Sequence, residues 1–292
     1  MIWVWILLGL AALLIGAVSF YGASEISGIP YLAVPYTPKD FGLACEEVSF
    51  QSHDGLKLLG WFLPAPTPSS QTIFVLHGLG SNAGDMLLNA LALARTGKWN
   101  LFFVNFRGHG GSEGHLTSLG PLELKDFESA LDFIKKSKPD QTRRLAVYGH
   151  SLGASVAIVG AARHPELEGV AAESPFARTR TTISYFATTF YGIPEFPFMY
   201  LAIFLAQIHL RTWLWGFGPI NEIGKLSPRP LLIIHAERDQ RMPLADTMAL
   251  MAAAGEPKEL WVVPGAGHGE PWIVAKDEFE SRVVNFFNGV FK

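Results

Sequence analysis

Cysteine and net charge are both scarce in this sequence. Cys45 is the one cysteine among 292 residues, which excludes an intrachain disulfide framework and any cysteine-based metal site. The formal net charge is −3 at pH 7, so no basic surface for nucleic acid is indicated. No internal repeat is present. These absences leave a chain that fits one large α/β domain or two small ones and is long enough to bury a sizeable core. We expect neither a metal ion nor a cofactor.

Charge is also absent from a stretch near the N-terminus. Ile2–Tyr21 is an uncharged run of 20 residues, the length that crosses a bilayer as one helix. Trp3 and Trp5 lie near one end, and Phe20 and Tyr21 at the other, as in an aromatic belt. We therefore predict a single-pass membrane anchor, with its orientation left open. The alternative is the cleaved signal peptide of a secreted or periplasmic protein, which the lack of a basic residue before the run and the length of the run disfavour.

The chain then divides into a short connection and one domain. We predict an anchor over residues 1–22, a linker rich in Pro, Gly and Tyr over 23–42, and a domain over 43–292 that folds without the anchor. Apolar runs typical of strands recur in this domain, at 45–51, 56–63, 72–76, 101–104, 145–148, 169–172, 231–235 and 260–263. Helical patterns such as Leu122–Lys136 lie between them. This alternation predicts an α/β fold with an eight-stranded, mostly parallel sheet and helices on both faces.

One segment does not fit the alternation. Residues 178–225 separate the sixth and seventh predicted strands and are rich in aromatic residues but poor in charge. Such a segment could be one crossover helix with a long approach, but it is longer than a connection requires. We predict a helical cap over the site, in which Phe190, Phe198 and Trp215 contact the substrate.

A short glycine-flanked turn is the clearest chemical motif. Gly149–Gly153 reads G-x-S-x-G and lies between the apolar strand 145–148 and the small-residue helix 154–161. In a nucleophile elbow, this pattern presents a serine on a strained strand-to-helix turn. The motif alone is a weak signal, but its strand and helix context strengthens it. Ser151 is therefore the candidate nucleophile.

A serine nucleophile requires a base and an orienting acid, which follow the serine in this order: acid, then histidine. Asp239 lies in the loop after the strand 231–235, and we prefer it to Glu237, which is closer to the strand end. His268 lies in the glycine-rich loop after the last strand and is the candidate base. The backbone N–H groups of Leu79 and Leu152 are the candidate oxyanion donors.

These motifs together resemble the alpha/beta-hydrolase superfamily, from about Gly42 to the end of the chain. The resemblance is to the monoacylglycerol-lipase and serine-aminopeptidase-like branch, and to membrane-anchored alpha/beta-hydrolase domain-containing proteins. The matching segments are 77–80 (HGLG), 107–112 (RGHGGS), 149–153 (GHSLG), 174–176 (SPF), Asp239 with 242–243 (MP), and 267–268 (GH). Family members often carry an acidic residue where Asn105 stands, a departure that affects loop structure and not the triad.

The resemblance implies a serine hydrolase that cleaves carboxylic esters, with an apolar acyl chain favoured by the predicted cap and anchor. An acyl-protein thioesterase or a serine peptidase would use the same triad. The partners implied are a small-molecule ester or lipid and a membrane; the oligomeric state is not indicated.

A different class of enzyme is the remote alternative. Residues 78–83 also satisfy the G-x-G-x-x-A pattern of a dinucleotide fingerprint, which would suit a nicotinamide-dependent oxidoreductase. However, a predicted hairpin precedes this strand, no Tyr-x-x-x-Lys pair occurs, and Ser151, Asp239 and His268 would remain unexplained.

Overall fold

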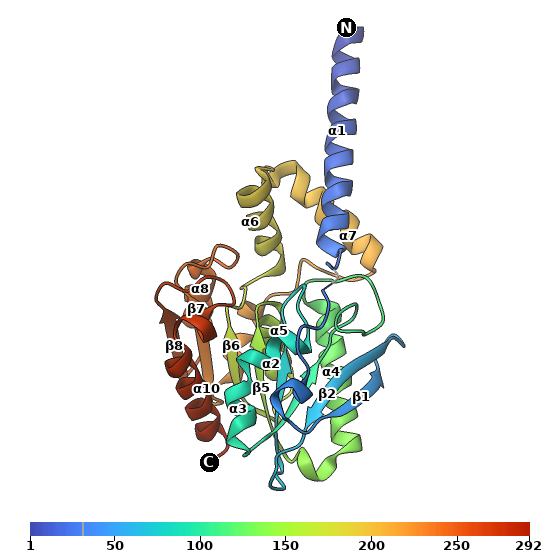
Figure 1. Cartoon of the computed structure of the whole chain (residues 1–292). Helices are drawn as coiled ribbons and strands as arrows, with labels where there is room; N and C mark the ends of the chain where they lie inside the picture. The colour runs from blue at the N-terminus through green and yellow to red at the C-terminus, as the bar shows by residue number, and fades with distance from the viewer. Residues whose placement is uncertain (31) are drawn as a thin grey trace.

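The fold is built on one twisted sheet of eight strands. The computed structural model describes residues 1–30 and 32–292, and Figure 1 shows the sheet below a protruding N-terminal helix. The strand order is β1-β2-β4-β3-β5-β6-β7-β8, with every neighbouring pair from β4 to β8 parallel and β2 antiparallel to both β1 and β4. The strands are β1 Glu46–Gln51, β2 Lys57–Leu63, β3 Gln71–Leu76, β4 Asn100–Val104, β5 Arg144–His150, β6 Leu167–Glu173, β7 Leu231–Ala236 and β8 Lys258–Val263.

Helices cover both faces of the sheet, as the sequence predicts. On one face, α4 (Pro121–Ser137), α5 (Leu152–Arg163) and α8 (Leu244–Ala253) bury side chains such as Phe74 and Val147. On the other face, α2 (Ala83–Asn89), α3 (Leu91–Thr96) and α10 (Lys276–Val290) bury their neighbours Ile73 and Tyr148. Because successive strand residues point to opposite faces, each buried strand contributes to both cores. Short helices complete the domain: η1 Pro38–Phe41, η2 Pro139–Gln141, η4 Pro219–Asn221, η5 Ile223–Leu226 and α9 Pro271–Val274.

The predicted cap is present between β6 and β7. It consists of α6 (Thr179–Tyr191), the single turn η3 (Glu195–Met199) and α7 (Tyr200–Leu210), and Figure 1 shows it above the C-terminal edge of the parallel strands. The two helical segments meet at a bend of 120°. Buried side chains of the cap form a separate apolar cluster that includes two residues of the N-terminal helix, Ala23 and Ile26.

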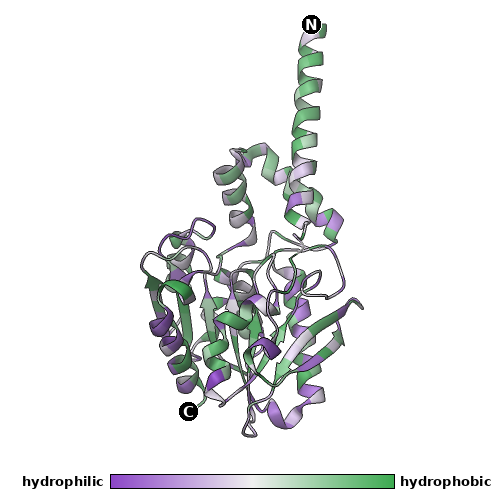
Figure 2. Cartoon of the chain, viewed as in Figure 1, coloured by the Kyte–Doolittle hydropathy of each residue, from purple (hydrophilic) through white to green (hydrophobic). Residues whose placement is uncertain are grey.

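The N-terminal helix α1 (Ile2–Ser27) is longer than the predicted anchor. It is long and apolar enough to cross a membrane, a property that signal sequences share. Figure 2 shows that the part that projects from the domain is mostly hydrophobic, and its large apolar side chains are exposed. One face of its C-terminal end is buried instead: Ser19 Oγ donates to the carbonyl of Phe198 at 3.1 Å, and Ser27 O accepts from Thr117 N at 3.0 Å.

The predicted linker, residues 23–42, contains the end of α1 and continues along the domain. The segment after α1 lies against the domain: the carbonyl of Ala33 accepts from Asn82 Nδ2 at 3.3 Å, and Pro30 and Leu32 lie beside Gly80. The physical reason is that this segment contains apolar residues that gain by covering the loop after β3.

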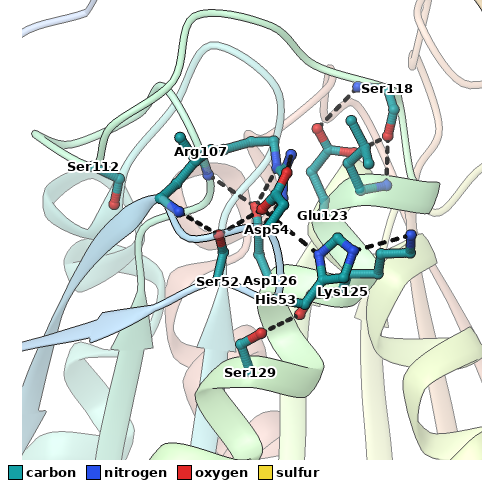
Figure 3. Close-up of polar contacts among 12 residues, drawn as sticks. Ser52, His53, Asp54, Arg107, Ser112, Ser118, Glu123, Lys125, Asp126 and Ser129 are labelled. Carbon is teal, nitrogen blue, oxygen red and sulfur yellow. Dashed lines mark hydrogen bonds and ion pairs between the residues drawn. The ribbon is translucent and has the colours of Figure 1, made fainter. Parts of the chain in front are cut away.

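A buried arginine joins the 105–113 loop, the β1–β2 turn and α4 (Figure 3). Arg107 donates to both carboxylate oxygens of Asp54 in the β1–β2 turn, at 3.0 and 3.1 Å, and to both of Asp126 on α4, at 2.6 and 2.9 Å. Asp126 is fully buried. Although burial raises the pKa of Asp54, hydrogen bonds from Arg107 and Ser52 lower it to about 2. The bridge fixes the 105–113 loop, whose His109 Nε2 accepts from Gly80 N at 3.1 Å.

Replacing Arg107 by Met should destabilise the fold strongly. The substitution keeps an apolar stem but leaves Asp126 as a buried charge without its partner, which typically costs about 3–5 kcal/mol. We expect Tm to fall by roughly 10 °C in thermal unfolding followed by circular dichroism. The matched control is Lys125→Met on the same helix, because Lys125 contacts only the exposed His53 in this network. Equal Tm values for the two variants would contradict the assigned role of the bridge.

Candidate active site

The turn between β5 and α5 places Ser151 at the C-terminal edge of the sheet. Ser151 has φ 53° and ψ −116°, a strained conformation for a residue with a side chain. A Cβ atom at Gly149 would collide with the carbonyl of Gly153, and one at Gly153 would collide with the carbonyl of Leu76 on β3. Both glycines of the motif are therefore required by close backbone approach, and the turn holds the serine hydroxyl above the sheet.

Loops after β7 and β8 bring an acid and a base to the same place. His268 Nε2 lies 3.1 Å from Ser151 Oγ, and His268 Nδ1 lies 2.8 Å from Asp239 Oδ2. The other oxygen of Asp239 accepts from the backbone N–H groups of Arg241 and Met242, at 2.9 and 2.8 Å. The carboxylate is thus held in one orientation. With the imidazole proton on Nδ1, bare Nε2 can accept the hydroxyl proton of Ser151.

Glu237, the rival acid, serves a different purpose. Its Oε2 accepts from Gly265 N at 2.7 Å, which ties the end of β7 to the loop that carries His268. Asp239 alone of the two contacts the imidazole.

Burial and charge set the protonation of the pair. Burial lowers the pKa of His268 below its ordinary value, against the opposing effect of Asp239. Burial alone would raise the pKa of Asp239, but its hydrogen bond to His268 holds that pKa below the usual range. At pH 7 the imidazole is therefore neutral and the carboxylate is charged, which is the state in which His268 can act as a base.

The two residues predicted to donate oxyanion N–H groups line the same cavity as Ser151. Leu152 is the first residue of α5, and Leu79 lies in the loop after β3; both line one cavity with Ser151. Within residues 1–30 and 32–292, neither N–H donates to a protein acceptor. His77 steadies the Leu79 loop, since its Nδ1 contacts Gly78 O at 2.7 Å and its Nε2 accepts from Phe106 N at 3.0 Å. These N–H groups are free to bind a developing oxyanion.

The cavity above Ser151 has a volume of about 590 Å³ and mostly apolar walls. Its floor comes from the loops that carry Ser151, His268 and Leu79, and one side comes from α2. The cap and the N-terminal segment supply much of the remaining wall, together with Leu119, Phe176, Arg241, Met242, Trp272 and Ile273. Their lining residues are Thr179, Thr182, Ile183, Phe186, Ala187, Tyr191, Ile193 and Met199 from the cap, with Tyr21, Gly22, Glu25, Ile26 and Leu32 from the N-terminal segment.

The three cap residues chosen from the sequence do not line this cavity. Phe190 is half exposed and packs on Phe186, while Phe198 and Trp215 pack inside the cluster between the cap and α1. The correction has a physical reason: the inward face of α6 depends on how α6 packs within the cap, where η3 is its neighbour, and aromatic content does not reveal that face.

The N-terminal lining residues were not predicted, although the sequence indicates that the end of α1 packs on protein. Ser19, Ala23 and Ile26 recur at spacings of three and four and are buried against the cap. Small residues at this spacing form helix-packing faces. Such a face inside an apolar run is a signal that the helix end packs on protein.

A second buried acid–imidazole pair lies beside His268 and is also absent from the predictions. His150 Nδ1 is 3.5 Å from Glu173 Oε1, and the rings of His150 and His268 are 4.9 Å apart. Tyr148 Oη donates to Glu173 Oε2 at 2.6 Å. Glu173 ends β6, so its position follows from the parallel order of the strands. Burial raises its pKa, yet its interactions with His150 and Tyr148 leave that pKa below the ordinary value.

Other candidate chemistry is not supported by the described part of the chain. Among residues 1–30 and 32–292, no group of three His, Cys, Asp or Glu residues is placed to hold a metal ion. Burial raises the pKa of Cys45 to about 11, so this thiol is inert at pH 7. The glycine-rich 78–83 loop, which suggested a dinucleotide site, is covered by Pro30 and Leu32 and faces Ser151.

Comparisons with known proteins agree with this geometry. Residues 67–213 match the family model described as serine aminopeptidase, S33. The uncharacterised protein YfhR of Escherichia coli is 27% identical over 249 residues, which cover 83% of this chain and 80% of YfhR. The alpha/beta hydrolase domain-containing protein WAV2 of Arabidopsis thaliana is 26% identical, with 82% of this chain and 77% of WAV2 covered.

A solved structure extends the likeness to nearly the whole domain. The esterase Pf2001 of Pyrococcus furiosus superposes with a TM-score of 0.73 at 26% identity, covering 89% of this chain and 98% of the esterase. Because the family model spans half of the sequence and the fold matches as well, the chain belongs to the serine aminopeptidase S33 family of alpha/beta hydrolases.

Proposed function

We propose that this protein is a membrane-anchored serine hydrolase that cleaves carboxylic esters of apolar acyl chains. One observation carries the proposal. The hydrogen-bonded chain from Asp239 through His268 to Ser151 opens into an apolar cavity of about 590 Å³. A serine hydrolase needs the hydrogen-bonded triad, and a substrate with an apolar acyl chain needs the apolar cavity.

The proposed reaction has two halves. Ser151 Oγ attacks the ester carbonyl while its proton passes to His268 Nε2, and the N–H groups of Leu79 and Leu152 stabilise the oxyanion. His268 then gives the proton to the departing alcohol, leaving an acyl-enzyme on Ser151. Water, deprotonated by His268, attacks this acyl group, and the acid is released as Ser151 regains its proton. Asp239 orients the imidazole and stabilises its charged form throughout.

An ester is the favoured substrate class because the Pyrococcus furiosus neighbour is named an esterase. A serine peptidase is the second candidate, since the family description names an aminopeptidase and the Glu25 carboxylate lines the cavity, where it could bind a substrate amino group. An acyl-protein thioesterase would use the same groups.

Anchoring by α1 is favoured over cleavage of a signal peptide. Cleavage after about Ser19 would remove the hydroxyl that contacts Phe198 in the cap. Cleavage after about Ser24 would also remove Ala23, which packs on the cap, and the cavity-lining residues Tyr21 and Gly22. Retention of the helix keeps the cap contacts and the cavity wall intact.

Substrate class can be separated by a panel of p-nitrophenyl esters, acyl thioesters and aminoacyl amides. We expect kcat/KM for apolar acyl esters to exceed that for every aminoacyl amide, because the cavity walls are mostly apolar. Faster turnover of an aminoacyl amide, lost in Glu25→Gln, would instead establish the peptidase.

Ser151→Ala should lower kcat by about 10⁴-fold or more without unfolding the protein, because it removes the nucleophile. A fluorophosphonate probe should label the wild type at Ser151 and leave the variant unlabelled, as read by mass spectrometry. Ser155→Ala is the matched control, since Ser155 lies one turn along α5 and its Oγ accepts from Phe176 N at 3.0 Å. Labelling of another serine would refute the assignment.

Activity should fall as the pH drops, because only neutral His268 can accept the serine proton. Its pKa is below the ordinary value of about 6.5. The acid limb of kcat/KM should therefore have its midpoint below about 6.5, with full activity at pH 7. Asp239→Asn should lower kcat by roughly 10³-fold or more through loss of imidazole orientation. Glu237→Gln is the control and should cost far less; the reverse order would show that the acid is wrongly assigned.

A further inference from the structure

The cavity reaches the surface beside the N-terminal helix. Several of its lining residues are exposed, among them Glu25, Leu32 and Ile273. Tyr21 on α1 is 56% exposed, and Tyr191 at the end of α6 is 62% exposed. These two are the exposed aromatic lining residues on the two apolar elements that project from the domain, and Tyr21 is the last residue of the uncharged run of α1.

The cap is almost free of charge. Between Arg180 and Arg211, Glu195 is the one residue with a formal charge. That charge is paired, because Glu195 Oε1 accepts from Arg180 Nη1 at 3.1 Å and from Ser184 Oγ at 3.2 Å. Taken together, α6 and the η3–α7 segment are apolar enough to pass as a membrane span, but their 120° bend prevents them from crossing as one straight helix.

Large apolar side chains of the cap point to solvent. The exposed residues include Phe190, Phe196, Phe204, Ile208 and Trp213. Figures 1 and 2 show the cap rising beside the lower half of α1, so the two apolar surfaces are neighbours. A soluble protein rarely exposes a contiguous apolar surface of this kind without a partner.

The length of α1 fixes where a bilayer would end. Ile2 to Ser19 rise about 26 Å along a helix, close to the hydrocarbon thickness of about 30 Å. Ser19 is the first buried residue, and its hydroxyl contacts Phe198 in η3 at the apex of the cap. A bilayer crossed by α1 therefore meets the protein at the cap.

We propose that the uncharged face of the cap lies in the leaflet that α1 enters, and that a lipid acyl chain passes from this leaflet into the cavity between Tyr21 and Tyr191. In this arrangement, Ile26 on the last turn of α1 forms a wall of the acyl site. The inference rests on the proposed function for the identity of the substrate. A lipid bilayer is preferred to a second copy of the chain because the exposed cap face continues the exposed surface of α1, which requires lipid itself.

Membrane contact can be measured without any hydrolysis. Cys45→Ala removes the native thiol, and Phe204→Cys then carries an environment-sensitive NBD probe in full-length protein reconstituted into phosphatidylcholine vesicles. The matched control is Met248→Cys on α8, because Phe204 and Met248 are 53% and 52% exposed. We expect doxyl-labelled lipid to quench the probe at position 204 severalfold more than at 248, and aqueous iodide to do the reverse.

Two results would overturn the membrane contact. Equal quenching by iodide at both positions would place the cap in water. Shielding that depends on protein concentration, with crosslinking between copies through position 204, would show that a second copy covers the cap. Because the probe reports depth alone, either result is independent of whether the protein is an esterase.

The wall formed by α1 is tested by chain-length preference. Ile26→Trp should lower the ratio of kcat/KM for p-nitrophenyl dodecanoate to that for the butyrate by about tenfold, and Ile26→Ala should raise it. Leu14→Trp, on the exposed part of α1, should leave the ratio unchanged. An unchanged ratio in both Ile26 variants would exclude α1 from the acyl site, whereas absence of ester turnover in the wild type would refute the proposed function instead.

Discussion

The first turn of α5 lies so close to β3 that a side chain at Gly153 would collide with the carbonyl of Leu76, and the site depends on this close approach. It lets α5 start directly against β3 and forces Ser151 into a left-handed turn at φ 53°. Once the hydroxyl is fixed in this way, the loops after β3, β7 and β8 have to meet it. They do so because the parallel strands end at one edge of the sheet, so a single backbone contact determines where the acid, the base and the free N–H groups must lie.

The same geometry explains what could be predicted from the sequence. Ser151, Asp239 and His268 each follow a buried apolar strand, and the carboxyl ends of parallel strands share an edge; chain order was therefore sufficient to bring them together. Glu173 ends a strand at that edge too and could have been found by the same rule. Phe190, Phe198 and Trp215 could not be placed, because a cap helix shows its inward face only once its packing partners are known. In this cap, α1 packs on η3 and α7, and η3 packs on α6.

The role of α1 depends on two kinds of face along one helix. Its first part exposes apolar side chains on all sides, whereas Ser19, Ala23 and Ile26 form a face that packs on the cap. An uncharged sequence is compatible with either kind of face. Composition alone therefore does not distinguish a helical turn exposed to lipid from a turn packed on protein. The segment predicted as a linker also contacts the domain, since Pro30 and Leu32 lie beside Gly80.

The departure at Asn105 from the usual acidic residue is explained by its contacts. Asn105 Oδ1 accepts from Ala83 N at 2.8 Å at the start of α2, and its Nδ2 donates to Gly110 O at 3.4 Å. A carboxylate could accept the first bond but could not donate the second, and it would place a charge at a buried position. The amide satisfies both loops without that charge. Because Arg107, two residues along the chain, is already engaged by Asp54 and Asp126, its guanidinium would not compensate an acid at position 105, which favours the asparagine.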